Sequence, residues 1–440
     1  MRMYDIIAAK RDGRELTEEE LSFFVRGYTA GEIPEEQASA LAMAIYFRGM
    51  SAHETAVLTD RMAHSGDCTD LSAFGETTVD KHSTGGIGDK TTLVVAPVAA
   101  ALGATVAKIS GRGLGCTGGT VDKLESIPGF CTSLSADAFF EQLKRIRLCV
   151  TGQSGNMVPA DKKLYALRDT TATVESLPLI ASSIMCKKLA SGARSIVLDV
   201  KTGSGAFMKT PAEAERLAQM MVEIGSSAGR RMCALVTDMD EPLGDAIGNA
   251  LEVQEALRVL HGEIRDGALY QLCVRLSAKM VSLAFGWEDA VSLEKVQKAI
   301  SEGGALEKME EMVTAQGGDP AYVRNPSLFR PAPFCQELIA EADGILSATD
   351  AAGIGNACML LGAGRAKKND RIDPSAGILL DIHCGADVKR GDRIATLYAS
   401  DRTLFPEAER VFRSALTFSD HAPQKHPLVY REITGTAKPR

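Results

Sequence analysis

The apolar positions of the first 65 residues recur with helical spacing, and no strand pattern interrupts them. Thr17 and Glu20 form a capping box before one apolar run, and Ser51 and Glu54 form another. Pro34 suits the first turn of the helix between them. Residues 1–66 are therefore predicted to form an all-helical domain, and residues 160–190, which again look helical, are expected to return to it.

Short β-rich segments alternate with helical runs from about residue 70. The β-rich segments are residues 77–80, 105–110, 195–200 and 232–237, and one helix between them opens at Thr210 with Pro211 behind it. This alternation is typical of a mainly parallel sheet flanked by helices. Residues 70–156 and 191–335 are therefore predicted to form a larger α/β domain.

From about residue 345 the pattern changes to short strands and glycine turns, such as residues 377–380 and 394–397. We predict a C-terminal β-rich (α+β) domain over residues 345–432. The fold class is thus α/β, with a small all-helical domain and a β-rich C-terminal domain. The turn at residues 387–392 resembles those of biotinyl or lipoyl carriers, but no Met-Lys-Met turn is present.

Composition narrows the possible functions of this chain of 440 residues. The net charge of -8 and the 5% of aromatic residues argue against a nucleic-acid-binding surface. The ten cysteines form no C-x-x-C pair, which disfavours zinc ribbons and indicates reduced thiols in the cytoplasm. The most apolar stretch, residues 93–107, is too short to span a bilayer. We expect a cytoplasmic enzyme with no membrane partner.

Two glycine-rich segments contain the candidate chemistry. The first, residues 81–92 (KHSTGGIGDKTT), lies between a predicted strand and a long apolar helix. Glycine lets the backbone wrap closely around a ligand, and hydroxyls with backbone N–H groups at a helix N-terminus bind anions. Lys81 adds a positive charge. We interpret the segment as a phosphate-binding loop rather than a tight turn with a solvated lysine.

The second segment, residues 108–120 (KISGRGLGCTGGT), contains G-x-G-x-x-G spacing at Gly113, Gly115 and Gly118. This spacing occurs in dinucleotide-binding folds. However, the next helix is stopped early by the Pro-Gly pair at 128–129, and no clear strand ending in an acidic residue follows about twenty residues on. Two such loops after neighbouring strands fit one anion held from two sides better than they fit a nicotinamide dinucleotide.

These segments, the continuation Thr120–Gly129 (TVDKLESIPG) and residues 199–208 (DVKTGSGAFM) closely resemble pyrimidine-nucleoside phosphorylases, near relatives of thymidine phosphorylases. The resemblance covers essentially the whole chain. It implies a helical domain, an α/β domain, a C-terminal β domain and a homodimer. It also implies the cleavage of uridine, thymidine and 2′-deoxyuridine by inorganic phosphate, which gives free base and pentose 1-phosphate.

Residue by residue, the resemblance implies two sets of ligands. The phosphate contacts, one cation and four hydroxyls, are Lys81, Ser83, Thr92, Ser110 and Thr120. The base contacts are Arg168, Ser183 and Lys187, and Lys108 is a further substrate contact. Ser183 and Lys187 are spaced to face the same way on a helix. Lys188, next to Lys187, is expected to be solvated.

The leaving group decides the candidate catalytic residues. Negative charge develops on the pyrimidine oxygens as the N-glycosidic bond breaks through an oxocarbenium-like state. Arg168 and Lys187 are expected to stabilise that charge, and His82 to donate a proton or a hydrogen bond, since histidine titrates near neutral pH. Phosphate is the nucleophile, so no cofactor is expected to be required.

The phosphate loops and the base helix belong to different domains, which implies closure about hinges near residues 152–155 and 192.

Two positions depart from the family pattern. Cys116 stands where a histidine usually links the loops across the closed cleft, and we interpret it as a small loop filler. Lys90 stands where potassium-binding members have threonine. The rest of that metal site would be Gly88, Leu243, Ala246 and Glu255. We expect the Lys90 ammonium to replace the cation near Glu255, so that dependence on K⁺ is weak or absent.

Lys108 bears on the choice of sugar, because strict thymidine phosphorylases tend to have methionine there. A lysine is able to form a hydrogen bond with a ribose 2′-OH, which favours acceptance of uridine.

Three other functions fit parts of the sequence. An anthranilate-phosphoribosyltransferase-like enzyme shares the helical-plus-α/β plan but needs Mg²⁺ held by acidic pairs. A nicotinamide oxidoreductase would use the G-x-G-x-x-G spacing, and a non-catalytic carrier would use the C-terminal domain.

Overall fold

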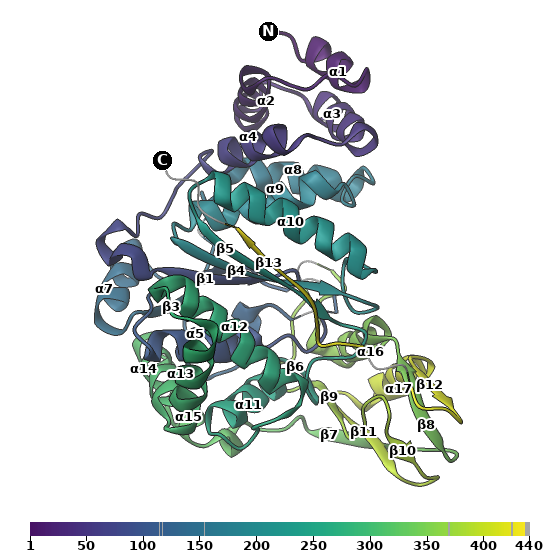
Figure 1. Cartoon of the computed structure of the whole chain (residues 1–440). Helices are drawn as coiled ribbons and strands as arrows, with labels where there is room; N and C mark the ends of the chain where they lie inside the picture. Colours follow the sequence, from purple (N-terminus) through teal and green to yellow (C-terminus); the bar gives the residue numbers. More distant parts are fainter. Residues whose placement is uncertain (114, 117, 154, 368–369, 424–425, 436–440) are drawn as a thin grey trace.

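The computed structural model describes residues 1–440 except 114, 117, 154, 368–369, 424–425 and 436–440. Its N-terminal unit is helical, as predicted, and both capping boxes are present. The helices of this unit are α1 (Met3–Arg11), α2 (Glu18–Ala30), α3 (Glu35–Arg48), α4 (Ala52–Ala63), α8 (Pro159–Thr170) and α9 (Leu177–Ala190). Figure 1 shows α8 and α9 beneath α4, so the chain returns to this unit after forming part of the sheet.

The central unit is a mainly parallel sheet, in the order β1-β4-β5-β13. Its strands are β1 (Val79–Ser83), β4 (Ser195–Thr202), β5 (Arg231–Asp238) and β13 (Val429–Gly435). A second parallel pair, β2 (Val106–Ser110) and β3 (Leu148–Gly152), continues it through a parallel bridge between Thr78 and Thr105. The first three strands run parallel, whereas β13 is antiparallel.

Helices cover both faces of this sheet. They are α5 (Thr91–Ala101), α6 (Thr120–Leu124), α7 (Ala136–Ile146), α10 (Pro211–Ser227), α11 (Asn249–Leu260), α12 (Gly267–Phe285), α13 (Asp289–Ser301), α14 (Gly304–Ala315) and α15 (Ala321–Arg324). All residues of β4 are buried, as expected for a strand packed on both sides. Ile196 and Leu198 join the core formed with α9 and α10, whereas Val197 joins the core formed with α5 and α12.

The C-terminal unit is β-rich, as predicted. Its elements are β7 (Phe334–Ile339), β8 (Gly344–Thr349), α16 (Ala351–Cys358), β9 (Gly377–Leu380), β10 (Asp387–Val388), β11 (Arg393–Ala399), α17 (Phe405–Ser414) and β12 (Leu416–Ser419). They form the sheets β6-β9-β11-β7 and β10-β8-β12, where β6 (Ala246–Gly248) comes from the α/β region.

Two strands differ from the domain assignment that we predicted. β7 starts before residue 345, and β13, assigned to the C-terminal domain by its position in the chain, pairs instead with β5 of the central sheet. Figure 1 shows this last strand lying along the central sheet. Periodicity describes a strand but not its partner, because pairing joins segments that are distant in sequence. Across the part of the chain described, every helix is too short or too polar to pass through a bilayer.

Candidate active site

The two glycine-rich segments meet at one edge of the sheet. β1 ends at Ser83 and β2 ends at Ser110, and the parallel bridge before them shows that both strands run the same way. Thr92 lies in the first turn of α5, and Thr120 is the first residue of α6. All four hydroxyl side chains are half-buried. The edge beyond the carboxyl ends of parallel strands is where ligands bind in such sheets, so the predicted phosphate hydroxyls share the right edge.

Lys81 lies beneath this edge and is almost fully enclosed. Its Nζ donates to Thr91 Oγ1 at 2.5 Å. It also lies 3.3 Å from Asp199 Oδ2 and 3.9 Å from Asp89 Oδ1. Burial alone would lower the pKa of Lys81, but the two carboxylates outweigh it and raise the pKa. Lys81 is therefore an enclosed cation, which rules out the alternative of a solvated turn lysine.

Asp80, on the other face of β1, separates two buried lysines. Its Oδ2 accepts a hydrogen bond from Lys188 at 2.7 Å, and its Oδ1 lies 3.3 Å from Lys108 Nζ. Lys188 is only 4% exposed, so the prediction that it is solvated is wrong. The last turn of α9 directs it onto β1 because the buried Asp80 carboxylate needs a counter-charge. Sequence analysis missed Asp80, although an acidic residue inside a buried strand signals a buried ion pair.

Lys108 reaches from β2 across to β1. Its Nζ donates to the Lys81 carbonyl at 2.5 Å and pairs with Asp80. Burial and the charges of Lys188 and Lys81 lower the pKa of Lys108 to about 7, despite the opposing effect of Asp80. An ammonium has three N–H groups, so one is left for a substrate hydroxyl.

His82 lies in the field of four lysines. Burial lowers its pKa well below 6.5, and so do the charges of Lys188, Lys108, Lys81 and Lys187. This environment argues against the expectation that His82 titrates near neutral pH, since burial and those cations disfavour a further positive charge there. Neutral imidazole still has one N–H. It is able to donate a hydrogen bond to a departing base, but it is not a ready source of a proton.

Ser183 and Lys187 lie one turn apart on α9, as predicted. Lys187 Nζ donates to the Ser183 carbonyl at 3.0 Å and to Ser183 Oγ at 3.2 Å. It also lies 2.5 Å from Oδ2 of the buried Asp161 on α8. Burial would lower the pKa of Lys187, but Asp161 outweighs it and raises the pKa. The cation is thus fixed in direction while its side chain stays 30% exposed. No local pattern in the sequence identifies Asp161, which lies on a different helix.

Arg168 is buried at the end of α8. Its three nitrogens donate to the carbonyls of Thr173 at 3.2 Å, Leu179 at 3.0 Å and Val174 at 2.7 Å. These bonds fix the connection between α8 and α9. A guanidinium has five N–H groups, so two remain for a ligand. Arg168 therefore holds the base helix in place, and its direct contact with a base remains a prediction.

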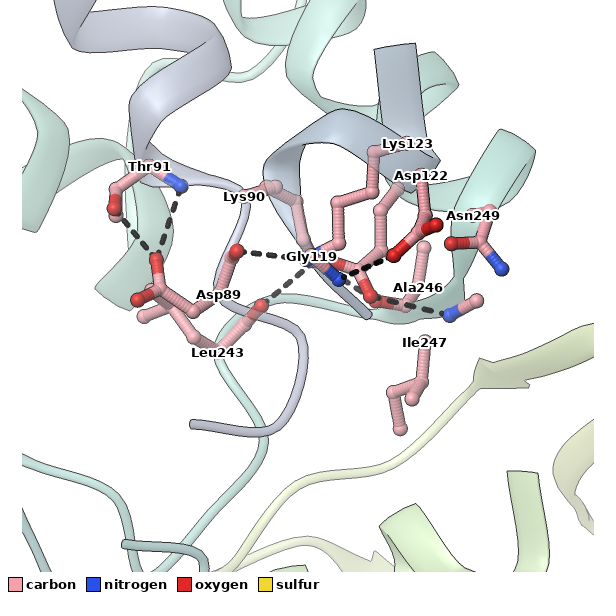
Figure 2. Close-up of polar contacts among 12 residues, drawn as sticks. Asp89, Lys90, Thr91, Gly119, Asp122, Lys123, Leu243, Ala246, Ile247 and Asn249 are labelled. Atoms are coloured by element: carbon pink, nitrogen blue, oxygen red, sulfur yellow. Dashed lines mark hydrogen bonds and ion pairs between the residues drawn. The ribbon is translucent and has the colours of Figure 1, made fainter. Parts of the chain in front are cut away.

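Lys90 fills the position at which the resemblance places a potassium ion. Its Nζ donates to the carbonyls of Leu243 at 2.7 Å and Ala246 at 2.8 Å (Figure 2). It lies 2.5 Å from Glu255 Oε2, which confirms the predicted contact. Its backbone N–H donates to the Gly88 carbonyl at 2.9 Å. Carbonyl and carboxylate oxygens of this kind suit a hard cation, and here the ammonium group of Lys90 lies among them.

Cys116 is half-buried in the second loop. Burial raises the pKa of its thiol, which disfavours the thiolate. This environment favours the interpretation of Cys116 as a loop filler over that of a nucleophile.

Comparisons with known proteins agree along the whole chain. A profile of the helical bundle domain of a glycosyl transferase family matches residues 4–66, and that of the a/b domain of the same family matches residues 75–306. A profile of the pyrimidine nucleoside phosphorylase C-terminal domain matches residues 345–419. The pyrimidine-nucleoside phosphorylase of Geobacillus stearothermophilus is 50% identical over 99% of this chain and 100% of its own. That of Bacillus subtilis (strain 168) is 54% identical over 91% of this chain and 92% of its own.

One solved structure has a similar fold over much of this chain. Anthranilate phosphoribosyltransferase from Thermus thermophilus aligns with a TM-score of 0.57 at 20% identity, and the alignment covers 71% of this chain and 99% of that one. At this identity the likeness concerns the fold alone, which the weighed alternative correctly anticipated. The C-terminal match and the high identities instead concern the phosphorylases. The chain is an enzyme of the pentosyltransferase class and belongs to the pyrimidine-nucleoside phosphorylase family.

Proposed function

We propose that the sheet edge of this pyrimidine-nucleoside phosphorylase binds inorganic phosphate and that α9 holds the pyrimidine. One observation carries the assignment: Lys81 lies enclosed below two hydroxyl-rich loops, while its neighbour Asp80 pairs at 2.7 Å with Lys188, the residue next to Lys187 on the base helix. A phosphate above Lys81 and a base beside Lys187 thus place the sugar between them. The pentose is the group transferred.

In the reaction, a phosphate oxygen attacks C1′ as the bond from C1′ to the base nitrogen breaks. The electron pair of that bond moves onto the pyrimidine, and its charge spreads to the ring oxygens. Lys187, which stays protonated beside Asp161, stabilises this charge. The N–H of His82 donates a hydrogen bond to the leaving base, and water supplies the proton that completes the free base. Positioning by the loops accounts for much of the acceleration.

The test is release of free base from uridine, thymidine and 2′-deoxyuridine, with and without phosphate. We expect release only with phosphate, together with stoichiometric pentose 1-phosphate. Phosphate-independent hydrolysis, or a requirement for a phosphoribosyl pyrophosphate, would contradict the assignment.

The sugar preference is tested at Lys108. We expect Lys108→Met to lower kcat/KM for uridine about tenfold more than for thymidine, because only the ribose has a 2′-OH that loses the Lys108 amino group as a hydrogen-bond partner. Asp80 keeps Lys188 as a partner in this variant, so folding is preserved. Both nucleosides are assayed at saturating phosphate, and equal losses would show that Lys108 does not select the sugar.

The cation requirement is tested at Lys90. We propose that the wild type needs no K⁺, because an ammonium already binds Leu243, Ala246 and Glu255. Lys90→Thr removes that charge and leaves a carboxylate that needs a counter-ion. In choline chloride its activity is expected to fall about tenfold or more, and KCl to restore it. Activation of the wild type by KCl over choline chloride, or no rescue of the variant, would contradict the proposal.

We also propose a homodimer formed through the helical unit. Tyr4 on α1 and Phe47 on α3 are 68% and 77% exposed, and Tyr46 lies beside Phe47. Large exposed apolar side chains gathered on one unit are typical of an interface. A monomeric mass by sedimentation equilibrium at micromolar concentration would contradict this proposal.

Two further expectations concern the cell and the cleft. The ten cysteines are all free, which supports a cytoplasmic location. The phosphate loops and α9 belong to different units, so closure is proposed to exclude water during catalysis. The expected hinges are near residues 152–155, of which 154 lies outside the described residues, and near Gly192. Small-angle scattering is expected to show compaction when phosphate and a nucleoside analogue bind together.

A further inference from the structure

The second glycine-rich loop, of which the structure describes residues 111–113, 115–116 and 118–119, is fastened to a segment of the C-terminal unit. Gly115 and Arg365 exchange two backbone hydrogen bonds, at 2.9 and 3.2 Å, as an antiparallel bridge. The approach is close, because a Cβ on Gly364 would lie 2.5 Å from the Gly115 carbonyl oxygen. Glycine at position 364 therefore permits the contact. The loop belongs to the α/β unit in sequence, but Arg365, which bonds to it, belongs to the C-terminal unit.

Asp122, in the first turn of α6, joins the two ends of this loop. Its Oδ2 accepts from the backbone N–H of Gly113 at 2.7 Å and of Gly119 at 3.3 Å. Figure 2 shows the carboxylate of Asp122 turned toward Gly119. Burial alone would raise the pKa of Asp122, yet hydrogen bonds from Arg365 and Gly113 outweigh it and lower the pKa. The charged carboxylate thus holds the loop closed on itself.

Arg365 is the half-buried partner of this carboxylate. Its Nη2 donates to Asp122 Oδ1 at 2.8 Å, and its Nη1 donates to the Gly113 carbonyl at 3.0 Å. The Arg365 side chain is 13% exposed. Arg112 also reaches Asp122, at 3.2 Å, but its side chain is 54% exposed and also pairs with Glu125 at 2.5 Å, so its hold on Asp122 is weaker. The guanidinium of Arg365 therefore fixes both the Asp122 carboxylate, to which the loop amides are bonded, and the backbone of the loop at Gly113.

The loop connects two of the proposed phosphate contacts, since Ser110 ends β2 before it and Thr120 begins α6 after it. We propose that Arg365 is a positioning residue for phosphate: from the C-terminal unit, it holds the described part of the second loop in the shape that brings Ser110 and Thr120 to one anion. This inference rests on the phosphate site proposed above. It gives the C-terminal unit a part in substrate binding.

Steady-state phosphorolysis by Arg365→Met and Arg365→Lys tests the proposal, with phosphate and uridine varied separately. We expect Arg365→Met to raise the KM for phosphate about 10-fold to 100-fold, as a displacement of about 1 Å would. The KM for uridine should stay within about twofold, because α9 is untouched. Lysine supplies the charge but not the fork that bonds two acceptors, so Arg365→Lys should fall between Met and wild type.

Two controls separate positioning from general damage. Arg413→Met removes another arginine of the C-terminal unit, paired with Glu409 at 2.7 Å, and should leave both KM values unchanged. Arg112→Met should have a smaller effect than Arg365→Met. Equal rises in both KM values, or a phosphate KM unchanged in Arg365→Met, would overturn the proposal.

Hydrogen–deuterium exchange without substrate gives a readout independent of activity. The amides of Gly113, Gly115 and Gly119 are hydrogen-bonded in this arrangement, so Arg365→Met should exchange faster over residues 113–119 but not over 83–90. Unchanged exchange would refute the support by Arg365 even if the enzyme is active. Absence of phosphorolysis in the wild type would refute the proposed function instead.

Discussion

Replacing Lys187 with methionine is expected to lower kcat for uridine phosphorolysis about 10²-fold to 10³-fold, the effect of removing one donor from a developing negative charge. Lys187 is suited to this role because Asp161 and Ser183 fix its direction while part of its side chain is open to a ligand. The KM for phosphate should change little, because the phosphate loops are on another unit. Steady-state kinetics with each substrate varied in turn measure both effects.

The change also leaves the buried Asp161 without its cation, so a fall in activity has two possible sources. Adding Asp161→Asn removes the unpaired charge. We expect the double variant to regain thermal stability and to remain as inactive as Lys187→Met. Recovery of activity along with stability would show that Lys187 is structural only, and Lys162→Met, on the exposed side of α8, serves as the matched control.

Replacing Asp80 with asparagine is expected to destabilise the protein by about 3–5 kcal/mol, the usual result of breaking a buried ion pair from one side. Asp80 is fully buried between Lys108 and Lys188. Burial would raise its pKa, but these two lysines outweigh it and lower the pKa, so the carboxylate is charged in the folded protein. The amide leaves the Lys188 ammonium uncompensated and removes the charge partner of Lys108. Urea unfolding followed by circular dichroism measures the loss.

A second substitution separates charge balance from packing. Asp80→Asn with Lys188→Met removes one cation with the anion, and we expect it to be more stable than Asp80→Asn alone. If the two variants unfold at the same urea concentration, the ion pair is not the source of the effect. Asp70→Asn is the control, because Asp70 is an exposed carboxylate that accepts a bond from the Ser72 N–H.

Local features were readable without the structure. The capping boxes at Thr17 and Ser51 and the N-cap at Thr210 start helices where predicted, because a cap acts within one turn of chain. The glycine-rich segments follow strands, as expected. The pair Ser183 and Lys187 shares a helix face because helical geometry alone requires it. Lys90 beside Glu255 was foreseen only through the resemblance to a family.

The amino-acid sequence by itself thus determined the three-part fold, the family and the helices and loops that bear the chemistry. Only the tertiary structure decided that Lys188 pairs with Asp80, that Asp161 directs Lys187, that burial and nearby lysines lower the pKa of His82 and that Arg365 bonds to Asp122 beside the second loop. Periodicity and capping express interactions between near neighbours in the chain. Buried charge pairs instead depend on which distant segments meet, and that is settled by packing of the whole fold.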